Sequence, residues 1–186
     1  MSDQIKTYAK NGGTIFGICG GLQMLGNLLN DPDKKESNNE LNPFSYKGMN
    51  LLPIDTTFGG IKHTSQREEL VSWPERIIVK GFEMHYGESD LINNKNSEII
   101  SLFKNTSLGW VHEKKDKSFI GGTYLHGIFE NDEWRQQWIN KIRQKKGLNK
   151  LNPNEDNNKN KRDRLLDLLT DSFAKNINID NLIKAK

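Results

Sequence analysis

The sequence has little of what membrane-spanning, secreted or disulfide-stabilised proteins require. It holds one cysteine among its 186 residues, which excludes an internal disulfide and a metal site built from four thiolates. No apolar run approaches the roughly 18 residues of a membrane span, and the first residues lack the apolar core of a signal peptide. We therefore expect a cytoplasmic protein with no membrane partner, whose single thiol is either an inert core residue or a nucleophile.

Charge is distributed unevenly along the chain. Residues 141–186 carry 12 Lys and Arg against 6 Asp and Glu, whereas residues 1–140 carry 15 against 18. A basic tail on a mildly acidic body is more typical of a solvated helix than of a nucleic-acid-binding surface. We expect no nucleic-acid partner.

The apolar pattern predicts the α/β class. Residues 14–18 form a short β-branched run that is typical of a strand buried on both faces, and leucines at helical spacing follow it up to Asp31-Pro32. Residues 33–47 are polar and are expected to form a loop. The other expected elements are a helix over 3–11, mostly strands and turns over 48–125, and a helix over 132–146 capped by Asp132.

The same pattern divides the chain into three parts. Residues 1–147 form the expected domain, and residues 148–161 have the Asn- and Lys-rich composition of a linker. Residues 162–186 place Leu165, Leu168 and Phe173 on one stripe, which predicts an amphipathic helical tail packed on the domain.

The chemistry concentrates at residues 17–23, Gly-Ile-Cys-Gly-Gly-Leu-Gln. A strand that enters a Gly-x-Cys-x-Gly turn and continues as a helix has the pattern of a nucleophile elbow, in which the glycines permit a sharp turn. The helix amides lower the thiol pKa of Cys19, and the Gly20 N–H can donate to an oxyanion. The alternative interpretation is that Cys19 is a small core residue.

A thiolate nucleophile needs a base, and histidine suits this role near neutral pH. His63 lies in a polar stretch and is most simply interpreted as a surface residue, and His112 lies in an expected strand, where a structural role is the simpler interpretation. His126 ends the apolar run FIGGTYLHG, which places it at the carboxyl end of a strand. His85 alternates with Glu83 onto one face of an extended segment. We rank His126 first, with Glu83 and His85 as secondary candidates.

The elbow resembles that of class I (triad) glutamine amidotransferases. The run Gly-Thr-Tyr-Leu-His-Gly-Ile-Phe at 122–129 is similar to the catalytic-histidine segment of the cobyric acid synthase branch of that family. Further pieces match this branch in order, including residues 50–53, 56–58, 81–87 and 164–167. The resemblance covers nearly the whole chain and implies a flavodoxin-like sheet with a C-terminal helical tail.

The resemblance implies that Cys19 attacks the side-chain amide of glutamine and that His126 transfers the proton. It implies that Gln23 contacts the bound glutamine, with Gly20 as an oxyanion donor. The ammonia would go to an ATP-dependent synthetase domain that amidates a corrinoid, adenosylcobyrinic acid a,c-diamide, in cobalamin biosynthesis. No cofactor or metal is expected in this chain, whereas ATP and Mg²⁺ are expected in the synthetase domain.

Two departures from the family pattern stand out. Triad enzymes carry a glutamate two residues after the histidine, where this chain has Ile128, so we expect a Cys–His pair, with Glu83 or Glu130 as candidates to orient the ring. The second departure is that neither a phosphate-binding Gly-x-x-x-x-Gly-Lys-Ser/Thr loop nor the first strands of the amidotransferase sheet can be found. We expect a C-terminal fragment that is poorly soluble and inactive alone.

Two alternatives stay open. One is the glutaminase part of a related amidoligase, either cobyrinic acid a,c-diamide synthase or a subunit that amidates a peptidoglycan precursor. The other is an inactive remnant that only binds a partner.

Overall fold

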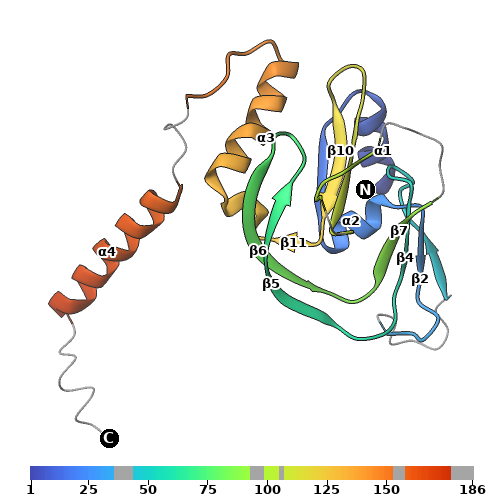
Figure 1. The fold of residues 1–186 in the computed structure, drawn as a ribbon, viewed down its shortest axis with the longest axis horizontal. Coiled ribbons are helices and arrows are strands. Elements are labelled where there is room, and N and C mark those ends of the chain that lie inside the picture. The colour runs from blue at the N-terminus through green and yellow to red at the C-terminus, as the bar shows by residue number, and fades with distance from the viewer. Residues whose placement is uncertain (36–43, 93–98, 105–106, 153–157, 177–186) are drawn as a thin grey trace, which may run out of the picture. The chain divides into compact units, whose positions relative to one another are not determined.

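Three β-sheets occupy most of the first part of the chain in the computed structural model (Figure 1). The structure describes residues 1–35, 44–92, 99–104, 107–152 and 158–176. The chain divides into two units, Met1–Lys150 and Leu151–Lys186. No helix within the described ranges is long and apolar enough to cross a bilayer.

The first sheet has the strand order β1-β10-β9-β8. Its parallel pair puts Gly17 opposite Gly122, and the other neighbours are antiparallel. The expectation that the first strand is buried on both faces is wrong, because this strand lies at one end of the sheet and leaves Ile18 38% exposed. The strands are β1 (Ile15–Ile18), β8 (Ile99–Ser101), β9 (Gly109–Glu113) and β10 (Phe119–Thr123).

The other two sheets are connected through a long hairpin: β5 and β6 belong to the second sheet, and the strand after them, β7, belongs to the third. Figure 1 shows β5 and β6 as a curved pair that passes below the first sheet and leads into β7. The second sheet has the order β11-β6-β5 and the third has the order β3-β2-β4-β7. These strands are β2 (Leu28–Asn30), β3 (Ser45–Lys47), β4 (Ile54–Thr57), β5 (His63–Val71), β6 (Ile77–His85), β7 (Glu88–Leu91) and β11 (Leu125–His126).

The helices confirm most of the expected positions. Asp132 is not the cap of its helix: Asn131 precedes the first turn, and the Asp132 carboxylate instead pairs with Arg135 within the helix. The helices are α1 (Ser2–Lys10), α2 (Gly20–Leu25), the 3₁₀ helix η1 (Ile128–Glu130), α3 (Asp132–Lys145) and α4 (Asn158–Asn176).

The helix expected after the elbow is shorter than its leucine pattern indicates. It ends at Leu25, and Leu28 lies in strand β2 between β3 and β4. Gly26 is extended, with φ −66° and ψ −176°, and a Cβ there would lie 2.7 Å from the Ile54 carbonyl oxygen. This close approach lets the chain leave the helix and pair beside β4. Part of the expected loop over 33–47 is likewise strand β3, and residues 36–43 lie outside the described ranges.

Aromatic side chains fill the space between α3 and the first sheet. Trp134 of α3 is fully buried, and its ring meets those of Phe16 and Phe129 at centroid distances of 5.6 and 5.0 Å. Burying such rings contributes roughly 1.5–3 kcal/mol per side chain. The core therefore anchors α3 and η1, and with them the segment just before η1, against strand β1.

Helix α4 belongs to the second unit. It begins at Asn158, inside the range expected to be linker. Leu165, Leu168 and Phe173 are 58%, 60% and 61% exposed. The packing of this tail on the domain stays a prediction.

Backbone-to-backbone contact joins β1 to α2. A Cβ added to Gly17 would lie 2.4 Å from the Gly21 carbonyl carbon and 2.6 Å from Leu22 N, whereas a Cβ added to Gly21 would meet no atom within 4 Å. The turn therefore needs glycine at position 17. At position 21 a side chain would meet open space.

We predict that Gly17→Ala lowers the free energy of unfolding by more than about 2 kcal/mol, because backbone atoms cannot move aside cheaply. Gly21→Ala is the matched control. It should leave stability unchanged or raise it by about 0.5–1 kcal/mol, since alanine favours a helix interior. Urea unfolding of both variants checks this, and equal destabilisation by the two substitutions would contradict it.

Candidate active site

Cys19 lies between β1 and α2 in a backbone conformation that is rare for a side-chain-bearing residue. Its φ is 53° and its ψ is −114°, and non-glycine residues held at positive φ cluster at functional sites. Its N–H donates to the Thr123 carbonyl at 2.8 Å, which ties the turn to the end of β10. The thiol is partly exposed, and its sulfur lies 3.5 Å from the Met84 carbonyl oxygen of β6.

The sequence predicted His126 at the carboxyl end of a buried strand. The structure instead places it on a separate short strand, β11. The chain leaves the first sheet at Thr123, whose Oγ1 donates to the Leu108 carbonyl and accepts from Leu125 N–H, both at 2.9 Å. Leu125 and His126 then pair with β6 in the second sheet. This change of sheet brings the histidine to the strand that contacts Cys19.

The imidazole of His126 lies over an aromatic ring. Phe82 is its cross-strand partner, and the two rings stack at 4.9 Å between centroids and 8° between planes. His126 Nε2 is buried and has no hydrogen-bond partner among the described residues. A buried polar atom without a partner is rare and calls for an explanation such as a catalytic role.

Strand β6 relates the two candidates to each other. Cys19 contacts the carbonyl of Met84, and His126 packs on Phe82, two residues earlier on the same strand. Two residues of a strand span about 7 Å. The thiol and the imidazole therefore border one short stretch of β6.

Gln23 is buried, and its amide nitrogen is already used. Nε2 donates to the Tyr86 carbonyl at 3.1 Å and to the Tyr124 hydroxyl at 3.2 Å. A contact with substrate would therefore fall to the amide oxygen of Gln23. Gly20 is the first residue of α2, where a backbone N–H has no acceptor within the helix.

A chain of hydroxyl groups continues from Gln23 into the interior. Tyr124 Oη lies 2.6 Å from Ser89 Oγ, which lies 2.7 Å from Thr56 Oγ1. Burial raises the pKa of the Tyr124 hydroxyl, and its hydrogen bonds with Ser89 and Gln23 only partly offset this. The hydroxyl stays protonated at neutral pH, and it holds the Gln23 side chain by accepting a hydrogen bond from Nε2.

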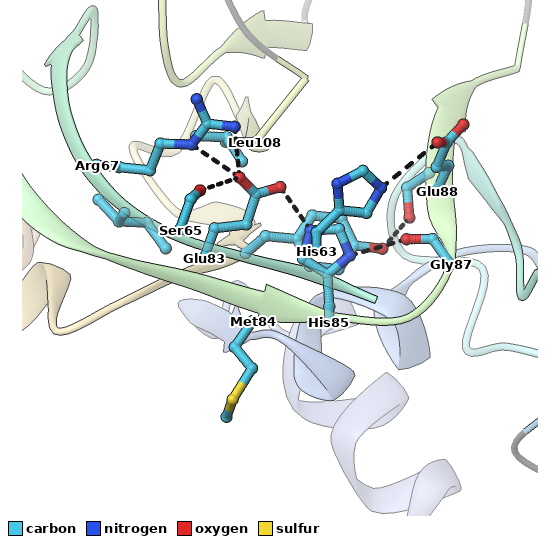
Figure 2. Close-up of polar contacts among 12 residues, drawn as sticks. His63, Ser65, Arg67, Glu83, Met84, His85, Gly87, Glu88 and Leu108 are labelled. Atoms are coloured by element: carbon cyan, nitrogen blue, oxygen red, sulfur yellow. Dashed lines mark hydrogen bonds and ion pairs between the residues drawn. The ribbon is translucent and has the colours of Figure 1, made fainter. Parts of the chain in front are cut away.

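Glu83 and His85 lie on the opposite face of β6 from Phe82 and Met84. Figure 2 shows Met84 pointing away from both, and Glu83 and His85 are 5% and 8% exposed, against 40% for Met84. Glu83 Oε1 lies 2.8 Å from His85 Nε2, and Glu83 Oε2 accepts from Arg67. The structure does not bring the Glu83 carboxylate to the His126 ring.

The charge of Glu83 is stabilised by its neighbours. Burial alone would raise the pKa of this carboxyl, but hydrogen bonds from Arg67 and His85 outweigh it and hold that pKa below its usual value. Arg67 approaches through Nε at 2.8 Å and Nη2 at 2.6 Å. At neutral pH this face of β6 therefore carries an ionised Arg67–Glu83 pair.

A cavity of ≈ 300 Å³ opens on this reverse face. Arg67, His85, Ser89 and Tyr124 are among its lining residues, and Cys19 and His126 are not. Within the described ranges, no group of three or more His, Cys, Asp or Glu is arranged to hold a metal ion.

The remaining candidates are separated from the thiol. His63 begins β5, stacks on His85 at 5.2 Å and lies 3.6 Å from Glu88, and His112 lies within β9. Ile128, at the position where triad enzymes carry glutamate, is fully buried. Glu130 ends η1, and its role in orienting the imidazole stays a prediction.

The sequence reasoning missed Arg67, Ser89 and Tyr124. The only signal for Arg67 is that its strand alternates polar residues, and the β5–β6 register that places it beside Glu83 cannot be read without the paired strands. Tyr124 lies inside the histidine motif, and its apolar neighbours made it look like an ordinary core residue.

Comparison with known proteins gives a consistent family assignment. Residues 1–134 match the CobB/CobQ-like glutamine amidotransferase domain family. Cobyric acid synthases of Prochlorococcus marinus strains NATL1A and NATL2A are each 77% identical over 184 residues, which is 99% of this chain. The cobyric acid synthase of strain MIT 9313 is 43% identical over 184 residues. The chain spans 37%, 36% and 37% of the lengths of these three relatives.

We predict that Tyr124→Phe lowers the free energy of unfolding by about 1–3 kcal/mol. The phenyl ring keeps its packing, but Gln23 and Ser89 each lose a buried hydrogen-bond partner. Tyr46→Phe, at a residue that is 38% exposed, is the control and should change stability by less than about 0.5 kcal/mol. Thermal unfolding measures both, and a neutral Tyr124→Phe would show that the hydroxyl chain does not hold Gln23.

Proposed function

The chain belongs to the CobB/CobQ-like glutamine amidotransferase domain family, and we propose that it performs the glutaminase step of a cobyric acid synthase. Cys19 is the nucleophile and His126 the general acid–base. One observation carries this proposal: a cysteine held at φ 53° and a histidine with an unpartnered buried nitrogen border the same stretch of β6.

The first half of the reaction releases ammonia. The Cys19 thiolate attacks the side-chain carbonyl carbon of glutamine, forming a C–S bond and a tetrahedral oxyanion. His126, which has taken up the thiol proton, returns it to the amide nitrogen as the C–N bond breaks. The products are ammonia and a γ-glutamyl thioester on Cys19.

The second half regenerates the thiol. His126 takes a proton from water, the resulting nucleophile attacks the thioester carbonyl, and the C–S bond breaks to give glutamate and the Cys19 thiolate. The Gly20 N–H donates to the oxyanion in both halves. The amide oxygen of Gln23 accepts from the substrate, because its nitrogen is held by Tyr86 and Tyr124.

A second enzymatic activity must consume the ammonia that the glutaminase step releases. Relatives named cobyric acid synthase are more than twice as long as this chain. We propose that an ATP-dependent synthetase part, fused to this chain or separate from it, receives the ammonia and amidates corrinoid carboxylates in cobalamin biosynthesis. ATP and Mg²⁺ belong to that part.

The role of His126 predicts a graded response to histidine substitutions. His126→Ala should lower glutamine-dependent turnover about 100- to 10,000-fold, the usual contribution of general acid–base catalysis. His112→Ala, on a strand away from the thiol, should cost less than about threefold. The measurement is glutamate release at saturating glutamine by the purified protein that carries the synthetase part.

Cys19→Ser is the reference variant in the same assay and should abolish glutamate release. Amidation with free ammonium should survive both substitutions in the protein that carries the synthetase part. Glutamate release that persists in Cys19→Ser, or a larger loss in His112→Ala than in His126→Ala, would refute the assignment.

A further inference from the structure

The pleat of β6 places two different groups of residues on its two faces. Phe82 lies under the His126 ring and the Met84 carbonyl meets the Cys19 sulfur. Glu83 and His85, which alternate with them, point to the reverse side (Figure 2). Any displacement of residues 82–86 would therefore be felt directly at the proposed glutaminase site.

The reverse-face residues form a continuous series of short charged contacts. Arg67 donates twice to Glu83 Oε2, at 2.8 and 2.6 Å. Glu83 Oε1 lies 2.8 Å from His85 Nε2, and His85 Nδ1 lies 2.8 Å from the Gly87 carbonyl oxygen. The side chains of Glu83 and His85 are both 6% exposed and that of Arg67 is 37% exposed, so solvent screens the Glu83–His85 contact less than the Arg67–Glu83 contact.

Each ring nitrogen of His85 lies beside an oxygen atom. A backbone carbonyl can only accept, so Nδ1 donates to Gly87, while Nε2 faces Glu83 Oε1. The ring is thus held between Glu83 and Gly87, and it stacks on the Tyr124 ring at 3.7 Å between centroids. The His63 ring also stacks on the His85 ring, at 5.2 Å between centroids.

The His85–Gly87 bond fixes the turn that follows β6. It spans Tyr86, whose carbonyl accepts from Gln23 Nε2 at 3.1 Å. Gly87 has φ +83°, and a Cβ there would lie 3.0 Å from the Thr57 carbonyl oxygen. The turn is therefore constrained on both sides.

We infer that Arg67, Glu83 and His85 are positioning residues for the glutaminase site, which they hold from behind β6. The inference rests on the proposed function of Cys19 and His126. Buried ion pairs contribute little net stability compared with apolar packing, whereas catalysis needs reacting groups placed to within a fraction of an ångström. The network therefore acts on geometry, through the backbone of residues 82–87.

Glu83→Gln tests this with little change of shape. We expect kcat for glutamine hydrolysis to fall about 10- to 100-fold, the cost of a misplacement of about 1 Å, with kcat affected more than KM. Glu68→Gln is the matched control: Glu68 forms an exposed pair with Lys80 across the same two strands at 3.1 Å. It should change kcat less than twofold.

His85→Gln, alone and combined with Glu83→Gln, shows whether the network is one unit. We expect kcat of the double variant to be no lower than that of the more impaired single variant, because substitutions within one hydrogen-bond network are not additive. Assays run well below each variant's midpoint of thermal unfolding separate misplacement from unfolding. A loss that only follows the unfolded fraction, or multiplicative losses, would overturn the inference.

Nitrogen NMR of His85 in the unmodified protein gives a readout that needs no variant. We expect Nδ1 to carry a proton that is hydrogen-bonded to the Gly87 carbonyl, and an Nδ1 without a proton would overturn the inference. The proposed function fails separately, if Cys19→Ser keeps its glutaminase activity. Folded Glu83→Gln and His85→Gln variants with kcat within twofold of the parent would overturn the positioning role while leaving Cys19 in place.

Discussion

The close packing of three backbone segments is the constraint on which the site depends. Gly17 of β1 lies against the Gly21 backbone, and a Cβ on its neighbour Gly122 would lie 2.6 Å from the Gly17 carbonyl oxygen. With no side chains between them, helix α2 begins directly at the end of the strand. Cys19, caught between the two elements, takes a positive φ and presents its sulfur at the edge of β6. The absence of side chains at these glycines thus positions Cys19, the proposed nucleophile.

Strand β6 keeps reactivity and charge on opposite faces. Cys19 contacts the Met84 carbonyl and His126 packs on the Phe82 ring, and in the proposed mechanism the thiol proton passes to the imidazole there. The reverse face holds the ion pair of Glu83, where the carboxylate is committed to Arg67 and His85. A carboxylate bonded to the His126 imidazole would make it a stronger base, but Glu83 bonds Arg67 and His85 instead, and position 128 holds Ile128.

The sequence predicted the features that arise from local backbone chemistry. The elbow at 17–23 was predicted because glycine spacing, strand and helix all lie within one short segment. Leu28 was wrongly assigned to a helix, because helical leucine spacing cannot reveal that the chain pairs with a strand that comes later. The change of sheet next to Tyr124 and the approach of Arg67 to Glu83 depend on strand register. Register is set by the whole set of paired strands, and no single segment encodes it.

The most direct test of the central claim is covalent labelling of the thiol by a glutamine-derived chloroketone. Cys19 is the only cysteine of the chain, so peptide mass spectrometry can locate the adduct without ambiguity. The account predicts one label per chain, on Cys19, formed much faster than with a chloroketone that lacks the glutamine moiety and slowed by added glutamine. Labelling that proceeds at the rate of a free cysteine and is unaffected by glutamine would contradict it.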